Sequence, residues 1–233
     1  MNDLAHQPMI DAGLAFDWSK LPPLANNVSD YDPTKNIIRL IRSGKELKGV
    51  SSLKNVKDFW AGSVNDKYLQ DLCELTQLEF LHITNLTANT LEPLRNLRNL
   101  SRLYIHNATN ISDLEWLTTH TQLKILSLEN LPQVSSFDPL SRLTQLTALA
   151  LNSGLWKDWR VKSLAPLKEL QLLNVLQLAG VRPSDGLLEP LASLRQLRIL
   201  GCANYFPAHE FLKLKSANPA LECSWFETLK GDA

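Results

Sequence analysis

Leucine makes up 47 of the 233 residues, and its positions repeat. Segments of the form Leu-x-x-Leu-x-x-Leu-x-Leu return along most of the chain. The second-to-last apolar position of successive copies falls at Phe59, Leu81, Leu103, Leu126, Leu149, Leu176 and Leu200. The steps between them are 22, 22, 23, 23, 27 and 24 residues. Self-similarity at such a period is typical of a solenoid, in which each repeat is one coil of the chain.

The pattern within one repeat explains why the coils would stack. The closing Leu-x-Leu alternates with exposed positions, so its two leucines point to one side of a β-strand. The preceding spacing of three suits a short helical or 3₁₀ turn. One such coil cannot bury its leucines alone, whereas a stack of coils with parallel strands can. The sequence therefore predicts a parallel sheet with short turns behind it.

A second motif recurs between the predicted strands. It has the form apolar-x-Pro-Leu. It occurs at Leu91–Leu94, Phe137–Leu140, Leu164–Leu167 and Leu188–Leu191. Together with the leucine pattern it resembles the short bacterial, internalin-like type of leucine-rich repeat. The resemblance implies a right-handed solenoid with its β-sheet on the concave face and short helices or 3₁₀ turns on the convex face. The family's usual inward asparagine is one residue early here, at Asn85, Asn107, Asn130 and Asn204, so either the inward ladder is lost or the turn is tighter.

The repeats divide the chain into three parts. We expect residues 1–36 to form an N-terminal cap or arm with a loose first dozen residues, and residues 37–206 to form the solenoid. Residues 36–42 read as one additional strand, in register with Phe59 and Ala61. Residues 207–233 would close the other end with a helix over 208–217 and a short strand over 220–226, because an open solenoid end must be covered.

Composition and charge narrow the function. The 24 basic and 24 acidic residues balance, which argues against nucleic acid or an anionic membrane as a partner. No apolar run is long enough to span a membrane, and no signal-like leader opens the sequence. Three scattered cysteines do not form a disulfide framework. We therefore expect a cytoplasmic protein.

Motifs for catalysis or cofactor binding are missing. The sequence has no phosphate-binding glycine loop, no Cys-x-x-Cys, no His-Glu-x-x-His and no Gly-x-Ser-x-Gly. We predict that the chain is not an enzyme, binds no cofactor or metal, and takes no small-molecule substrate.

The outward strand positions are where binding residues would lie, because they alternate with the buried leucines and line up across neighbouring strands. Large and charged side chains gather in the first half of these columns, and small ones such as Ala148, Ala150 and Gly201 in the second half. Aromatic and arginine side chains dominate binding energies at protein interfaces. We predict that the partner-binding residues of this face are Asp58, Trp60, Phe80, His82, Arg102, Tyr104, His106 and Glu129. In the alternative, the aromatic residues fill the curvature of the sheet or are covered by the N-terminal segment.

His82, His106 and Glu129 also raise the question of a metal site. The two histidines occupy different columns on neighbouring strands, which puts them about 8 Å apart by strand geometry. That separation is too large for one ion, so we expect a polar or pH-sensitive contact cluster.

The step of 27 residues marks an insertion at 154–160. It carries Trp156 and Trp159 among charged residues. Insertions in repeat proteins usually emerge on one face and often bind, so we include both tryptophans in the predicted partner-binding set. Packing of both indoles over the flank of the solenoid is an equal alternative.

We conclude from the sequence that this is a non-enzymatic protein-interaction module that binds another protein through its concave face. It could act by occluding the partner's surface, as an inhibitor or an immunity or antitoxin-like protein does. The internalin-like resemblance implies an alternative, a host-directed bacterial effector. A third possibility is the regulatory subunit of an enzyme complex.

Overall fold

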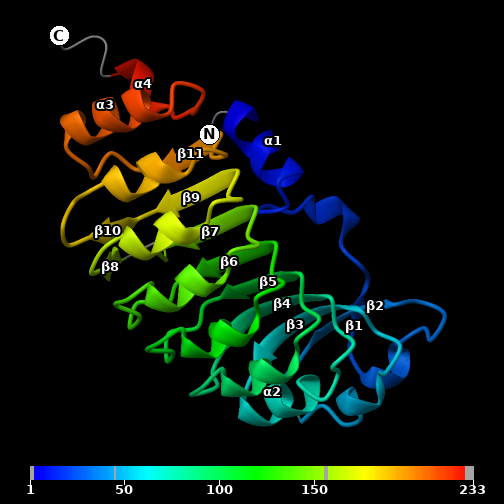
Figure 1. The fold of residues 1–233 in the computed structure, drawn as a ribbon. Coiled ribbons are helices and arrows are strands. Elements are labelled where there is room, and N and C mark those ends of the chain that lie inside the picture. Colours follow the sequence, from blue (N-terminus) through cyan, green and yellow to red (C-terminus); the bar gives the residue numbers. More distant parts are fainter. Residues whose placement is uncertain (1–2, 45, 155–156, 229–233) are drawn as a thin grey trace.

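The computed structural model describes residues 3–44, 46–154 and 157–228. Within these residues, nine parallel strands form one curved sheet, in which each inner strand pairs with those of the coils before and after it and the first and last strands form the edges (Figure 1). In sheet order they are β1 (Leu24–Ala25), β2 (Ile37–Ile41), β3 (Asp58–Val64), β4 (Phe80–Leu86), β5 (Arg102–His106), β6 (Ile125–Glu129), β7 (Ala148–Asn152), β9 (Val175–Ala179) and β11 (Ile199–Cys202). Because the order follows the chain, the predicted solenoid is confirmed.

The strand register matches the sequence columns. Leu81 pairs with Leu103 and Leu103 with Leu126, so the repeat leucines form continuous rows across the sheet. These rows are fully buried and belong to one core that runs the length of the solenoid. The additional strand over residues 36–42 is β2, in which Leu40 pairs with Ala61 as expected.

Short 3₁₀ turns form most of the convex face. They span Val50–Ser52, Glu92–Asn96, Glu115–Thr119, Asp138–Arg142, Ala165–Glu169 and Glu189–Ser193, and the helix α2 (Asp66–Leu72) takes their place in one coil. Proline stands in the first two positions of four of these turns, where its fixed φ favours the turn and its missing N–H is not needed. The repeated Pro-Leu phrase therefore starts the convex turns.

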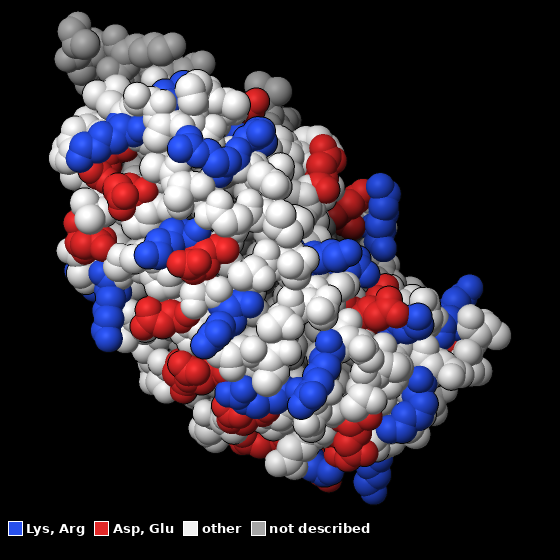
Figure 2. Space-filling view, viewed as in Figure 1, with Lys and Arg blue, Asp and Glu red and all other residues white. Residues whose placement is uncertain are grey.

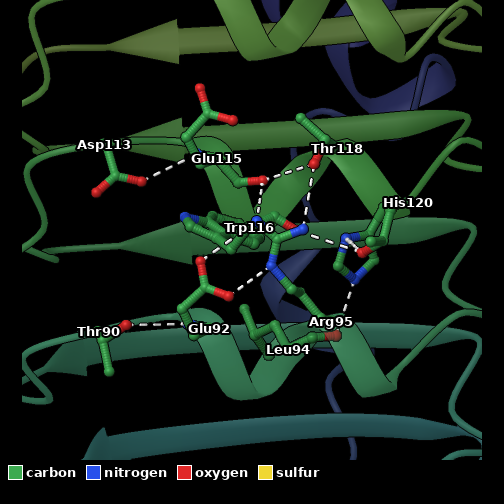
Figure 3. Close-up of polar contacts among 10 residues, drawn as sticks. Thr90, Glu92, Leu94, Arg95, Asp113, Glu115, Trp116, Thr118 and His120 are labelled. Atoms are coloured by element: carbon green, nitrogen blue, oxygen red, sulfur yellow. Dashed lines mark hydrogen bonds and ion pairs between the residues drawn. The ribbon is translucent and has the colours of Figure 1, made fainter.

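Polar contacts join successive turns on the convex side (Figure 3). Arg95 pairs with Glu92 in its own turn and donates to Thr118 Oγ1 and to the Glu115 carbonyl in the next. The buried His120 donates from Nε2 to the Leu94 carbonyl at 3.0 Å. These contacts satisfy turn carbonyls that stacking alone would leave unpaired.

The asparagines at or just after the C-terminal ends of the strands form a ladder. Asn85, Asn107 and Asn130 have φ between 54° and 59°, in the left-handed region that asparagine tolerates. Asn107 Nδ2 donates to Asn85 Oδ1, and Asn130 Nδ2 donates to Asn107 Oδ1. Because Asn85 and Asn107 are exposed, the early asparagine marks a tighter turn rather than an inward ladder.

The C-terminal end differs in part from expectation. The helix α3 (Ala208–Ala217) forms where it was predicted, and the buried Glu210 accepts hydrogen bonds from the N–H groups of Leu188 and Glu189. The prediction of a short strand over 220–226 is wrong. A single bridge from Ile199 to Glu222 is followed by the helix α4 (Trp225–Thr228), because the chain turns away after one strand contact.

The N-terminal region also departs from the expected loose tail. Residues 3–11 form the helix α1 (Asp3–Asp11), which lies near β9 and β11, and the chain then runs along the sheet toward β1 and β2 (Figure 1). Two 3₁₀ turns, Trp18–Lys20 and Val28–Asp30, flank β1. In the insertion, β8 (Trp159–Val161) pairs with β10 (Val181–Pro183) in a separate two-stranded sheet.

Candidate binding face

The concave side of the sheet is built from the outward columns of the strands. Trp60, His82, Tyr104 and Ser127 pair in one row, and Asp58, Phe80, Arg102 and Ile125 in the next. The predicted columns are therefore real surfaces of the sheet. Residues 3–16, which we call the N-terminal segment, cross them.

The ring of Phe16 lies among four side chains from β3, β4 and β5. We call the four the aromatic cage: Trp60, Phe80, His82 and Tyr104. The ring centroid of Phe16 is 4.6 Å from that of Trp60 and 4.7 Å from that of Tyr104. The His82 and Phe80 centroids follow at 5.3 and 6.2 Å. Most of these rings meet edge to face, which is a favoured arrangement for aromatic pairs.

The other half of the concave face receives smaller side chains. Leu14 is 8% exposed and packs against Ala148, Ala150 and Val175. Met9 lies over Gly201, where a Cβ would come within 3.3 Å of its Cε. The small residues predicted to make a shallow floor thus accommodate α1 and the turn that follows it.

The N-terminal segment changes what the face offers to a partner. Trp60 is 8% exposed and Tyr104 1%, and Phe80 and His82 are buried as well. The expectation that these four side chains are open is wrong for the free chain, because Phe16 and its neighbours cover them. The alternative reading, coverage by the N-terminal segment, describes the structure.

Asp58 and Arg102 remain half-buried at the rim of the cage. Arg102 Nη2 lies 3.4 Å from Asp58 Oδ1, and its guanidinium stands over the Phe80 ring at 4.9 Å. Burial raises the pKa of the Asp58 carboxyl, against the opposing effect of Arg102. The pair therefore spans the strand between them and closes one side of the cage.

His106 and Glu129 lie two residues beyond Tyr104 and Ser127 on β5 and β6. Both are half-buried, and they pair across β5 and β6. His106 Nε2 is 3.3 Å from Ser127 Oγ, and burial lowers the His106 pKa to about 4. Burial also raises the pKa of Glu129. With Thr84 and Asn152 these residues form a polar strip of half-buried side chains, which we call the open strip.

The two histidines are closer than strand geometry suggested. The ring centroids of His82 and His106 are 4.9 Å apart, because the side chains lean toward each other across adjacent strands. No group of three or more histidine, cysteine, aspartate or glutamate side chains that could hold a metal ion occurs in the part of the chain that the structure describes. The contact is therefore an aromatic one, with no third ligand among those residues.

The insertion is divided between surface and core. Trp159 is buried, packs against Phe137, and donates from Nε1 to the Val134 carbonyl at 2.7 Å. Its assignment as an exposed partner contact is wrong, because the indole fills the space behind β8. Trp156 lies outside the described residues. Lys157 and Arg160 line a surface cavity of about 730 Å³ at this edge of the solenoid.

Sequence reasoning missed Leu14 and Phe16 as residues of the binding face. A signal was present, since Met9, Ala12, Leu14 and Phe16 are apolar in a stretch otherwise rich in acidic residues. Positions 12, 14 and 16 alternate, as residues that face one surface do. Because this segment lies outside the repeats, the leucine period gives it no place.

On the face drawn in Figure 2, charge does not mark out one patch. Lysine and arginine side chains alternate with aspartate and glutamate over the face drawn in Figure 2. No helix among the described residues is long and apolar enough to cross a lipid bilayer.

Solved structures with a similar fold include internalins of Listeria monocytogenes. An internalin, InlF, superposes with a TM-score of 0.57 at 21% identity, covering 71% of this chain and 48% of InlF. Internalin C2 gives 0.52 at 21% identity, over 72% of this chain and 80% of that one. The functional domain of InlJ gives 0.54 at 18% identity, over 78% and 37%.

These similarities confirm the internalin-like leucine-rich-repeat fold. The chain spans about half the length of the InlF chain it matches. No protein-family model matches the sequence, and no curated protein matches it either.

Proposed function

We propose that this leucine-rich-repeat solenoid is a non-enzymatic protein-binding module, and that its partner docks on the concave face. The observation that carries the proposal is that this face already holds a polypeptide, the N-terminal segment, through side chains that no repeat requires. A surface that orders one peptide through Leu14 and Phe16 has the apolar anchors that protein interfaces use.

The open strip supplies the polar part of the proposed interface. His106 and Glu129 stand half-buried beside the apolar contacts, as polar groups do at the rim of an interface. His106 and Glu129 lie in a row along the sheet and not around an enclosed site of the kind that acid–base catalysis uses. This geometry supports binding over catalysis.

The proposed interaction can be tested by capturing partners from the native lysate with the purified chain. A double variant, His106→Ala with Glu129→Ala, should recover the partner with at least a fivefold lower yield. A matched variant on the convex face, Lys168→Ala with Glu169→Ala, should recover it in full. Equal recovery by both double variants would contradict the concave assignment.

The proposed mode of action is occlusion of the partner's surface, as in an inhibitor or immunity protein. The chain's one solenoid offers a binding surface and no second module among the described residues. Activity of the captured partner should fall as the chain is added, and the open-strip double variant should restore it. Unchanged partner activity at saturation would exclude inhibition.

The likeness to Listeria internalins favours a second candidate, a host-directed bacterial effector. Capture from bacterial lysate and from animal-cell lysate separates the two. Specific recovery from the animal-cell lysate alone would support the effector and oppose the immunity-type role.

We also propose a reducing compartment, the cytoplasm, as the site of action. Cys73, Cys202 and Cys223 are free thiols, and the Cys202 and Cys223 side chains are within hydrogen-bonding reach of each other without being joined. Thiol alkylation in intact cells followed by mass spectrometry should label Cys202 and Cys223 as reduced. Recovery of a Cys202–Cys223 disulfide would contradict the proposed compartment.

A further inference from the structure

We propose that the aromatic cage is the docking site for an aromatic side chain of the partner, and that Phe16 occupies this site in the free protein. The inference rests on the proposed function and names the chemistry of the partner. That partner presents an exposed peptide in which an aliphatic residue stands two positions before an aromatic one, as Leu14 stands before Phe16.

The first support is that the cage is separate from the core of the solenoid. Trp60, Phe80 and Tyr104 form a cluster of their own on the concave side of the sheet, and Ala148, Ala150 and Val175 form another with Leu14. The repeat leucines form the main cluster on the other side. The N-terminal segment can therefore leave without opening the leucine core.

The second support is that the N-terminal segment has little stability of its own. The helix α1 has nine residues and contains Pro8, which cannot donate a backbone hydrogen bond. An isolated helix of this length is marginal in water. Its order depends on contacts with the sheet, among them the hydrogen bond from Tyr104 Oη to the Gly13 carbonyl at 2.5 Å. A competing peptide that makes those contacts removes the support for α1.

The third support is an incomplete fit. Trp60 Nε1 and His82 Nε2 are buried and have no hydrogen-bond partner among the residues that the structure describes. Both residues line a small cavity of about 70 Å³ together with Leu21 and Arg39. A buried polar atom without a partner is destabilising, and the segment leaves two such atoms beside Phe16.

The position of this cavity adds one element to the partner's chemistry. The chain runs from Met9 near β11 to Leu21 near β2, so residues that follow the aromatic anchor point toward Trp60, His82 and Arg39. In this chain the carboxylate directly after Phe16 is that of Asp17, which accepts from Ser19 and pairs with Lys20. A partner whose carboxylate or amide oxygen reaches this cavity instead can accept from the Trp60 indole N–H and pair with Arg39. Such a partner gains contacts that the N-terminal segment does not make.

Tethering sets how strongly the segment competes. An attached segment acts at an effective concentration on the order of millimolar. The apparent affinity for a competing peptide is therefore its intrinsic affinity multiplied by the fraction of molecules in which the cage is unoccupied. Weakening the segment should therefore raise the affinity for a peptide added in solution, although the cage itself is unchanged.

The test uses the full chain and a fluorescein-labelled synthetic peptide with the sequence of residues 7–17. The double variant Leu14→Ala with Phe16→Ala should bind this peptide at least tenfold more tightly than the unaltered chain does. A second peptide, identical except for alanine in place of the phenylalanine, should bind at least tenfold more weakly. The matched control, Leu187→Ala with Leu212→Ala, removes two exposed leucines and should behave like the unaltered chain.

A measurement on the unaltered chain covers the case in which the double variant does not fold. Excess peptide should increase amide hydrogen exchange in residues 7–16 and leave exchange in β5 and β6 unchanged. Selection of a random peptide library on the double variant should enrich an aliphatic residue two places before an aromatic one, with an acceptor side chain following.

Three results would overturn the proposal. The first is equal peptide affinity for the unaltered chain and the double variant. The second is that neither protein binds the peptide and that amide hydrogen exchange in residues 7–16 is unchanged. The third is a dimer in which two chains swap their N-terminal segments. A fourth result separates it from the proposed function. If the open-strip variant loses the lysate partner while the Leu14→Ala with Phe16→Ala variant binds it with unchanged affinity, the protein-binding function stands and the cage is not its docking site.

Discussion

The two faces of the sheet are formed by alternate residues of the same strands, yet they are filled in different ways. In β5, Leu103 and Ile105 enter the leucine core, which every coil extends with the same residue types. Tyr104, between them, faces the other side and is covered by Phe16, a residue outside the repeats. One face is therefore made by repetition, and the other by a single match between two distant segments.

The difference shows which part of the molecule can change. Each buried leucine packs against leucines of both adjacent coils, so truncating one side chain weakens the packing of its neighbours as well. The concave contacts involve one segment, which lies outside the repeats and continues toward β1 at its C-terminal end. Changes to the concave contacts should release that segment and leave the solenoid folded.

The largest effect should come from the core face. Leu126→Ala removes a fully buried side chain in the middle of the stack and should lower the free energy of unfolding by about 2–5 kcal/mol. Leu212→Ala, at a side chain that is 56% exposed, should change it by less than about 0.5 kcal/mol. Urea denaturation followed by circular dichroism measures both, and equal losses would contradict the description of the core.

The second-largest effect should come from acid, which lowers the free energy of unfolding through His82 on the concave face. Burial, with His106 and Arg39 nearby, lowers the pKa of His82 to about 3. Below its ordinary pKa near 6.5 the unfolded chain therefore binds a proton that the folded one does not, and stability falls as the pH falls. Between pH 7 and pH 5 this one residue should remove about 2 kcal/mol.

The control for this prediction is His82→Phe, which keeps a ring in the cage and removes the titration. Its free energy of unfolding should vary less with pH than that of the unaltered chain over the same range. An identical pH dependence in the two proteins would show that His82 is not held neutral by the N-terminal segment.

Gly13→Ala should loosen the segment by a smaller amount. Gly13 has φ of 75°, and an added Cβ would lie 2.8 Å from Ile125 Cδ1. Strain and contact together should cost about 1–2 kcal/mol, confined to the docking of residues 3–16. Limited proteolysis should cut the segment faster in this variant.

Gly44→Ala provides the matched comparison. Gly44 has φ of 80° with open space around its Cα, so alanine there brings backbone strain without a contact to the sheet. Cleavage of the segment should stay at its original rate. Faster cleavage in both variants would mean that Gly13 has no special contact with the concave face.

The smallest effect should come from the asparagine ladder. Asn107→Gly keeps the left-handed backbone conformation and removes two side-chain hydrogen bonds at the exposed edge of the sheet. We expect a loss of about 0.5–1 kcal/mol and no change in segment cleavage. A loss comparable to that of Leu126→Ala would show that the ladder, and not the leucine rows, holds the coils together.

The sequence predicts the repeated face well because periodicity specifies it. Leu81, Leu103 and Leu126 recur at one spacing, and stacking is the arrangement that buries them all. The outward columns were also assigned correctly from alternation. Their state of exposure was not, since nothing in the repeats records that Phe16 crosses the sheet.

Two other departures have the same origin. Trp159 is core because β8 and β10 pair in a small second sheet, which the 27-residue step alone does not indicate. The close contact of His82 and His106 arises from side-chain orientation within a crowded cage, which strand spacing does not define. Repeats predict the register of the strands, whereas a contact that two distant segments make only once leaves no periodic signal in the sequence.

The central claim is that Phe16 lies in the aromatic cage of the free protein. Nuclear Overhauser contacts between the ring protons of Phe16 and those of Trp60 and Tyr104 measure this directly in solution. The structure predicts strong cross-peaks to both rings, since the centroids are 4.6 and 4.7 Å away. Absence of both cross-peaks in the folded chain, with Phe16 resonances at their unstructured positions, would contradict it.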